Sequence, residues 1–283
     1  MIYCNQYPIR AALFDLDDLL VDSTLSRAGF IVEAVRQLGI PVPDPYPKPL
    51  TEILSKCDGH GTLSVWDFPA AVLAYTDARL QKLGYSDDII AARDAEQFMQ
   101  HGCSVLRDCM NAAPDESTVL LDGARELLAF LKEQNIPTGI ISNAAQKNIP
   151  SLLARLGIED MIDIVFGDDK ARRTAAGQVI NKSSDPSACF TMVIDELHAL
   201  SSAFADIQPH EIIYAGDRPS DIKFAHAVGC IGVHIPSTIL PISAWPPDVP
   251  APQIIAQNLN ALRKLLDIQV ASSNKTECLP NSF

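Results

Sequence analysis

Two aspartates stand two residues apart near the N-terminus, in the stretch AALFDLDDLL, directly after a short apolar run. Residues two apart on an extended segment face the same side, so the carboxylates of Asp15 and Asp17 can address one bound group. One carboxylate can attack an electrophile while the other donates and accepts a proton. Taken alone, such a pair suits a metal site or a solvated turn equally well.

A second acidic group, GDRPSD, contains Asp217 and Asp221 and also follows an apolar run. Aspartate is favoured at helix N-termini, and Asp221 can serve partly as such a cap. If Asp217 ends a strand beside the one that precedes Asp15, their carboxylates and a backbone carbonyl form an oxygen-rich site that suits Mg²⁺. Such an ion would neutralise phosphate charge and let an anionic nucleophile approach an anionic substrate.

Two further groups could bind phosphate. Ser142 and Asn143 end the apolar run of GIISNA, where the serine hydroxyl and the adjoining amides could hold a phosphoryl oxygen. Lys182, in INKSSDP, offers an ammonium charge that suits both a phosphate and a nucleophilic carboxylate. Taken singly, a serine after a strand is a turn residue and a lone lysine is a solvated surface residue.

All these residues lie in or beside loops, most of them where an apolar run ends, and helical patterns alternate with those runs. We expect strands at 11–14, 139–141, 164–166, 212–215 and 231–233. We expect helices at 124–134, 147–156, 188–204 and 219–228. This alternation predicts an α/β fold with a parallel sheet covered on both faces. Ligands of such sheets bind beyond the carboxyl ends of the strands, where the polar residues lie.

The alternation is interrupted over residues 22–117, which carry apolar residues at helical spacing and predict helices at 25–38, 70–83 and 87–111. Alternating prolines between 41 and 49 predict an extended loop there. We therefore expect a helical cap domain at 22–117, inserted into a core formed by residues 1–21 and 118–283.

The end of the core carries three expectations of its own. We expect a proline-rich loop at 245–252, a last helix at 254–266 and a frayed polar tail from Ala271.

Composition narrows the class of protein. The 283 residues carry a formal charge of −13, so no basic surplus favours nucleic acid or an anionic membrane as a partner. No apolar run approaches the ~18 residues of a transmembrane helix. The seven cysteines include no CxxC pair, which favours reduced thiols in a cytoplasmic protein over a zinc site or a disulfide framework.

Taken together and in order, FDLDDLLVDS, IISN, a lysine and AGDRPSD resemble the four-motif signature of haloacid dehalogenase (HAD) superfamily hydrolases. The resemblance covers nearly the whole chain, from Leu13 to Val233. It implies a Rossmann-like, doubly wound sheet. The helical insertion after the first motif resembles the cap of the branch that contains phosphoglycolate phosphatase and β-phosphoglucomutase.

The resemblance also implies roles for individual residues. Asp15 would be the nucleophile and a magnesium ligand, and Asp17 the general acid and base, with its carbonyl also on the metal. Ser142, with Asn143 beside it, and Lys182 would bind the phosphoryl group. The magnesium site would be completed by Asp217 and Asp221.

Some positions depart from the family pattern. Asp18 stands where the family has glycine, at a backbone conformation that costs an aspartate about 1 kcal/mol or more. Its side chain either points into the cleft or points away, capping the turn or contacting a basic residue. We favour the second alternative because Asp17 must face the cleft. The lysine motif lacks a proline, and Lys170 competes with Lys182 for the phosphate-binding role.

These features predict a Mg²⁺-dependent phosphatase that hydrolyses a small phosphate monoester through an aspartyl-phosphate. A phosphomutase is one alternative, and a catalytically weak binding or regulatory protein is another. The substrate would be a small phosphorylated metabolite, with His60 and Arg79 as candidate selectors. The protein would act as a monomer or a homodimer.

Overall fold

The computed structural model describes residues 2–23, 117–168, 180–236 and 245–273, together with positions 33, 36, 37, 105, 108 and 109; for 267–273 the backbone alone is described. The chain divides into two compact units. The first contains Met1–Asp22, Val119–Ser237 and Pro241–Phe283, and the second contains Ser23–Thr118 and Thr238–Leu240. The predicted cap helices lie almost entirely outside the described residues. The extended loop predicted at 41–49, together with His60, Arg79 and Lys170, lies wholly outside them.

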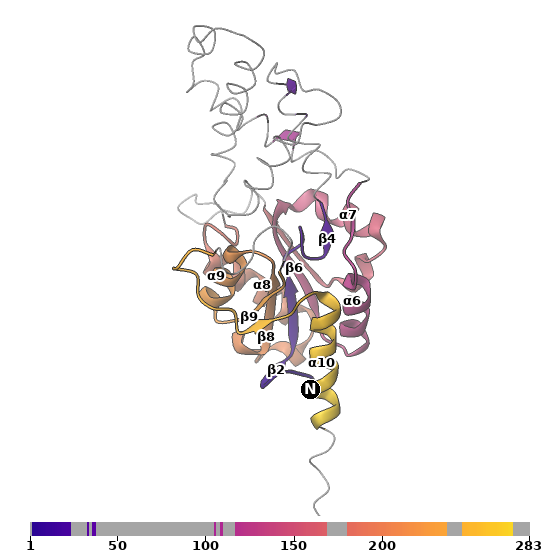
Figure 1. Ribbon diagram of the computed structural model, residues 1–283, viewed down its shortest axis with the longest axis vertical. Helices are drawn as coiled ribbons and strands as arrows, with labels where there is room; N and C mark the ends of the chain where they lie inside the picture. The colour runs from indigo at the N-terminus through magenta and orange to yellow at the C-terminus, as the bar shows by residue number, and fades with distance from the viewer. Residues whose placement is uncertain are drawn as a thin grey trace, which may run out of the picture. The chain divides into compact units, whose positions relative to one another are not determined.

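The first unit is built on a six-stranded sheet in the order β10-β9-β8-β3-β6-β7, and all its strand pairs are parallel (Figure 1). Its strands, in chain order, are β3 (Ala11–Phe14), β6 (Thr138–Ala145), β7 (Ile164–Asp168), β8 (Ile212–Gly216), β9 (Ile231–His234) and β10 (Ile254–Ile255). The chain runs outward from β3 to β6 and β7, then crosses to β8, β9 and β10. The order therefore reverses at β3, where sheets of this kind bind their ligands.

Helices cover both faces of the sheet, as the alternation of the sequence predicted (Figure 1). They are α6 (Ala124–Glu133), α7 (Ile149–Leu156), α8 (Pro186–Leu200), α9 (Pro219–Val228) and α10 (Leu259–Ser273). Single 3-10 turns occupy Gln146–Asn148, Glu159–Met161, Ser202–Phe204 and Pro209–Glu211. No helix among the described residues is long and apolar enough to cross a membrane.

Alternation along the strands divides the interior into two apolar clusters. On β3, Ala12 and Phe14 pack with residues of α6, α7 and α10, whereas Ala11 and Leu13 pack with residues of α8 and α9. Successive strand side chains point to opposite faces, so a strand covered on both faces must be apolar throughout. This explains why all four β3 residues are buried. The predicted doubly wound α/β core is confirmed.

The described core also differs from the prediction in its short elements. An antiparallel hairpin of β1 (Ile2–Cys4) and β2 (Tyr7–Ile9) precedes the sheet and was not predicted. The prediction that the last helix begins at 254 was wrong, because residues 254–255 pair with β9 and α10 begins at Leu259. The side chain of Asn258 accepts the N–H of Ala261, and this N-cap marks the true start.

Three more features complete the description of the core. The helix predicted over 188–204 begins earlier, at Pro186, and ends at Leu200. The chain leaves the sheet domain through β4 (Val21–Asp22) and returns through β5 (Val119–Leu120), and these two strands pair antiparallel. The four cysteines within the described residues are all buried.

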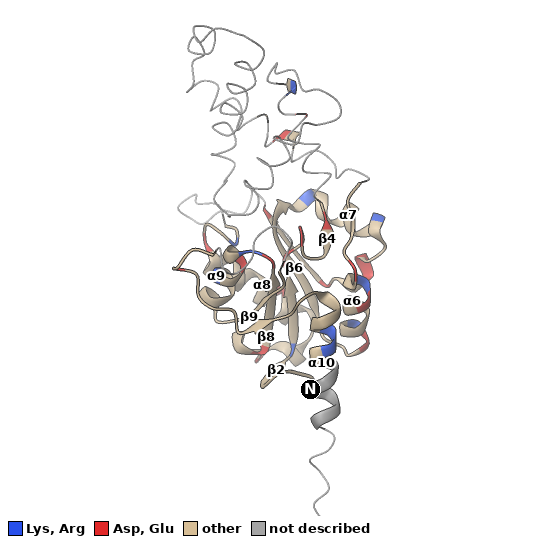
Figure 2. Cartoon of the chain, in the orientation of Figure 1, with Lys and Arg blue, Asp and Glu red and all other residues tan. Residues whose placement is uncertain are grey.

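Acidic and basic residues are interspersed over the described helices (Figure 2). On α6, for example, Glu126 lies in the first turn and Lys132 in the last. In the described part of the protein, acidic and basic side chains therefore lie together on the surfaces of the helices.

Candidate active site

The carboxyl end of β3 places Asp15 at the centre of the sheet edge. The Asp15 N–H continues the ladder by donating to the carbonyl of Ala215 on β8, over 2.9 Å. The chain then turns sharply, because the Leu16 carbonyl accepts the N–H groups of Leu20 and Val21. Asp15 is buried, with 6% of its surface exposed.

The carboxyl end of β8 supplies two more carboxylates. Asp217 follows the strand directly, and Asp221 lies in the first turn of α9, where one of its oxygens accepts the N–H of Arg218 over 3.0 Å. Gly216 makes this approach possible, since a Cβ at that position would lie 2.2 Å from the Cβ of Asp221. Asp221 therefore caps the helix with one oxygen and keeps the other for the site.

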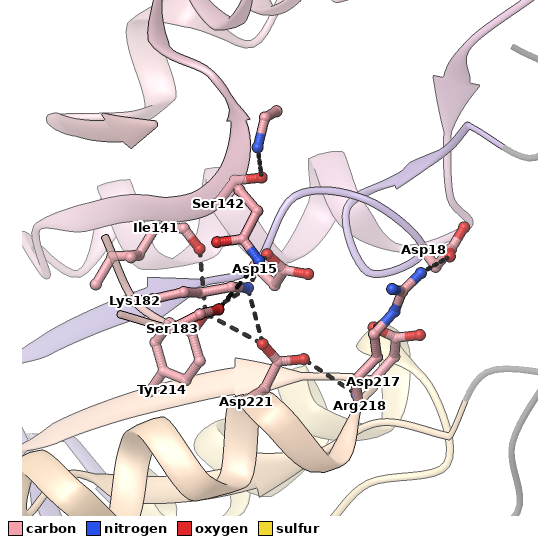
Figure 3. Close-up of polar contacts among 12 residues, drawn as sticks. Asp15, Asp18, Ile141, Ser142, Lys182, Ser183, Tyr214, Asp217, Arg218 and Asp221 are labelled. Atoms are coloured by element: carbon pink, nitrogen blue, oxygen red, sulfur yellow. Dashed lines mark hydrogen bonds and ion pairs between the residues drawn. The ribbon is translucent and has the colours of Figure 1, made fainter. Parts of the chain in front are cut away.

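Lys182 reaches the site from the loop before α8 and is itself buried (Figure 3). Its Nζ lies 2.6 Å from Asp15 Oδ1 and 2.9 Å from Asp221 Oδ1. Asn181 shapes this loop: its side-chain oxygen accepts the N–H groups of Ser183 and Ser184. Of the two competing lysines, Lys182 is therefore the one whose contacts the structure describes.

Tyr214 is a site residue that the sequence analysis missed. Its buried hydroxyl accepts from Lys182 Nζ at 3.3 Å and donates to the Ile141 carbonyl at 3.1 Å, while Asp221 Oδ1 is more distant at 3.4 Å (Figure 3). The only signal in the sequence was a hydroxyl inside an otherwise apolar strand, which needs a partner when buried. The side chain links β6, β8 and the lysine.

The expected phosphate-binding serine lies near the end of β6. Ser142 is buried, and its hydroxyl accepts the N–H of Ala144 over 3.0 Å. Asn143 is exposed, and its amide lies 3.4 Å from the Ser183 hydroxyl in the lysine loop. Asp17 is partly buried and forms an isolated bridge with Val21. Its role stays a prediction.

The crowding of carboxylates shifts their proton affinities. Burial raises the pKa of Asp15 to about 6, opposed by the charge of Lys182. Burial, with the charge of Asp221, raises the pKa of Asp217 to about 8. For Lys182, burial favours the neutral amine, but the charges of Asp15 and Asp221 outweigh it and raise its pKa. The site thus holds more negative charge than its lysine can balance.

A divalent cation fits this charge and geometry. One oxygen each from Asp15, Asp217 and Asp221 lie within 4.8 Å of one another. Octahedral Mg²⁺, with bonds of about 2.1 Å, separates its ligand oxygens by about 3–4 Å, so small side-chain movements suffice. Moreover, Asp217 Oδ1 is buried with no hydrogen-bond partner among the described residues, and a metal would satisfy it.

Asp18 contacts a basic residue, as the favoured alternative proposed. Its backbone is left-handed, with φ of 61°, and its carboxylate lies 3.2 Å from a terminal guanidinium nitrogen of Arg218. Arg218 was not singled out in the sequence, although it stands inside GDRPSD. Its Nε lies 3.9 Å from Asp217 Oδ1, so Asp18 is joined to the site through it.

The chain is similar in sequence to known proteins of similar length. The chain is 25% identical over 272 residues to a phosphoglycolate phosphatase of Shigella dysenteriae, which covers 95% of the chain and 97% of that protein. It is 26% identical over 231 residues to a phosphoglycolate phosphatase of Chromobacterium violaceum, which covers 82% of the chain and 86% of that protein.

Solved structures share the fold. A crystal structure described as a predicted phosphoglycolate phosphatase from Haemophilus somnus 129PT has a TM-score of 0.58 at 18% identity and covers 92% of the chain and 97% of that protein. A HAD-superfamily hydrolase of subfamily IA from Geobacter sulfurreducens has a TM-score of 0.53 at 19% identity, with coverages of 93% and 98%.

The family model of haloacid dehalogenase-like hydrolases matches residues 9–229. This range contains the aspartates after β3 and β8, the lysine between them and the strands that bring them together. The match spans most of the chain, and the chain therefore belongs to the haloacid dehalogenase-like hydrolases.

Proposed function

We propose that this hydrolase is a Mg²⁺-dependent phosphatase that transfers the phosphoryl group of a small phosphate monoester to Asp15 and then to water. The observation that carries the proposal is the position of Lys182, whose Nζ lies 2.6 Å from Asp15 and 2.9 Å from Asp221. A buried cation at the nucleophile, beside a cluster of carboxylates that fits a metal, suits an anionic substrate and little else.

The chemistry follows from the residues. An oxygen of Asp15 attacks phosphorus, and the bond between phosphorus and the ester oxygen breaks while Asp17 gives that oxygen its proton. Water then attacks the phosphorus of the aspartyl-phosphate, and Asp17 takes the water proton as the bond to Asp15 breaks. Inorganic phosphate leaves, and both carboxylates return to their starting forms.

The remaining residues stabilise charge. Lys182 and the Ser142 hydroxyl would hold equatorial phosphoryl oxygens, with Asn143 at the rim. Asp15, Asp217, Asp221 and the Asp17 carbonyl would hold Mg²⁺. The ion would supply neutralisation of phosphate charge as the anionic nucleophile approaches.

We extend the proposal to the substrate and the domains. The curated relatives described above carry the name phosphoglycolate phosphatase, so a small phosphorylated acid of that kind is the first compound to test. We propose that residues 22–117 act as the cap domain, which selects the substrate and excludes water on closure. Residues 1–21 and 118–283 would form the catalytic core.

The experiment is a screen of phosphorylated metabolites, 2-phosphoglycolate included, with purified protein in Mg²⁺ and in a chelator. We expect phosphate release from at least one small monoester, lost in the chelator and in Asp15→Asn. Turnover of Asp15→Asn within tenfold of the parent would contradict the covalent mechanism. Transfer between sugar isomers without phosphate release would indicate a mutase, and inertness with every compound would indicate a binding protein.

A further inference from the structure

Asp18 and Arg218 join the two loops that carry the site. Asp18 follows β3 by four residues, and Arg218 is the residue before α9. The contact at 3.2 Å is well sheltered, since 6% of the Asp18 side chain and 26% of the Arg218 side chain are exposed. Figure 3 shows the pair on the far side of Asp217 from Lys182.

The two residues enter the charge balance of the site together. The carboxylate of Asp18 adds a negative charge beside the acidic cluster of Asp15, Asp217 and Asp221, and the guanidinium of Arg218 adds a positive charge that opposes it. The guanidinium is near enough to act on the site directly, because its Nε lies 3.9 Å from Asp217 Oδ1. The charges of Asp18 and Arg218 also act on Asp217 in opposite directions.

We propose that Asp18 and Arg218 are a charge-balancing pair that sets the relative affinity of the site for a metal cation and for a phosphate anion. This inference rests on the proposed function, since it requires both ligands to bind at the site. Removing either partner changes the charge beside the carboxylates by one unit, and the sign of that change is opposite for the two residues. The two single substitutions should therefore shift each affinity in opposite directions, which a purely structural contact would not do.

The variants are chosen to change charge with little change of backbone. Asp18→Asn keeps a residue that tolerates a left-handed backbone, and Asp18→Gly tests the same loss of charge with no side chain. Arg218→Gln removes the positive charge, and Arg218→Lys keeps it. The control pair is Lys132 and Asp160, which lie 2.7 Å apart and are exposed.

The control pair is also remote from the site. Lys132 lies in the last turn of α6, just before β6 begins, and so at the opposite edge of the sheet from Asp15. Lys132→Gln and Asp160→Asn change the net charge of the chain by the same amounts as the test variants. They should therefore report any effect of overall charge alone.

The test is calorimetric titration of the protein with Mg²⁺ alone and, separately, with inorganic phosphate in the presence of Mg²⁺, at low ionic strength. Asp18→Asn and Asp18→Gly should bind Mg²⁺ about three- to tenfold more weakly and phosphate more tightly, the size that Coulomb's law gives for one charge within about 10 Å in a water-like dielectric. Arg218→Gln should do the reverse. The double variant Asp18→Asn with Arg218→Gln should return both affinities to within about twofold of the parent.

The controls and Arg218→Lys should stay within about twofold of the parent. If Asp18→Asn and Arg218→Gln shifted the same affinity in the same direction, or if their shifts were no larger than those of the controls, the inference would be overturned. The proposed function would not be affected by that result. A loss of phosphate affinity in Arg218→Lys as large as that in Arg218→Gln would also overturn the inference. A parent that binds neither Mg²⁺ nor phosphate would overturn the proposed function and the inference with it.

Discussion

Lys182 offers a direct test of the electrostatics, because it is a buried cation between two buried carboxylates. In Lys182→Met the side chain stays unbranched, becomes one atom shorter and loses its charge. In the parent protein the Lys182 ammonium lies 2.6 Å from Asp15 and 2.9 Å from Asp221. The side chains of Lys182, Asp15 and Asp221 are 5%, 8% and 0% exposed. Removing one partner from a buried ion pair costs about 3–5 kcal/mol, since it leaves an uncompensated buried charge.

For a core of this size, that loss corresponds to a fall in Tm of roughly 6–20 °C. The measurement is thermal unfolding followed by circular dichroism at pH 8 in a chelator. The matched control is Lys132→Met, which breaks a pair of similar length, 2.7 Å, whose side chains are 52% and 66% exposed. Solvent screens that pair, so its loss should move Tm by no more than about 2 °C.

The stability deficit of Lys182→Met should also depend on pH, and the direction of that dependence can be predicted. The charge of Lys182 holds down the pKa of Asp15, which is nevertheless raised to about 6 by burial. Without the lysine this pKa rises further, so the folded state binds a proton more readily than the unfolded state, and stability increases as pH falls through the folded pKa. The deficit of Lys182→Met should therefore be largest at pH 8 and smaller at pH 5. Saturating Mg²⁺ at pH 8 should also reduce it. A deficit no larger than that of Lys132→Met, or one independent of pH, would refute the described environment of Lys182.

Three other changes test other parts of the structure. Asp17→Asn should lower turnover by about 10²–10⁴, and phosphorylation should slow more with alkyl than with nitrophenyl esters; equal losses in pre-steady-state measurements would remove the acid role. Asp217→Ala should weaken Mg²⁺ binding, and calorimetry with unchanged affinity would place the metal elsewhere. Burial lowers the pKa of His234, whose ring lies 4.6 Å from that of Trp245. The unfolded chain therefore binds its proton first as pH falls below about 6.5. Between pH 7.5 and 5.5, the Tm of the parent should fall further than the Tm of His234→Phe. Equal falls in Tm would contradict a lowered pKa of His234.

The sheet and the position of the acidic residues were readable from the sequence because each depends on local pattern. An apolar run of three or four residues that ends in a polar one identifies a buried strand and its carboxyl end together. Asp15 and Asp217 were placed in this way. The parallel pairing of β3 with β8, which brings them together, follows from the alternation of strands and helices.

Short elements and long-range partners were not readable in the same way. The strand β10 has two residues and pairs with β9, and nothing within 254–255 distinguishes it from the first turn of a helix. Tyr214 carries no local sign of its contacts, since Lys182 is 32 residues away and Ile141 is 73 away. The side-chain hydroxyl states only that a partner is needed, and the tertiary fold decides which one.

Asp18 shows where local reasoning stops. Three non-glycine residues among those described have a positive φ, and the other two, Asn5 and Asn135, are asparagines, which tolerate the left-handed region best. The backbone cost at Asp18 was therefore foreseeable from the family pattern alone. Its compensation was not, because Arg218 is 200 residues further along the chain. The carboxylate that stands where the family has glycine thus contacts an arginine whose Nε lies 3.9 Å from Asp217 Oδ1, and this contact is the basis for our proposal that the two residues act together on the charge of the site.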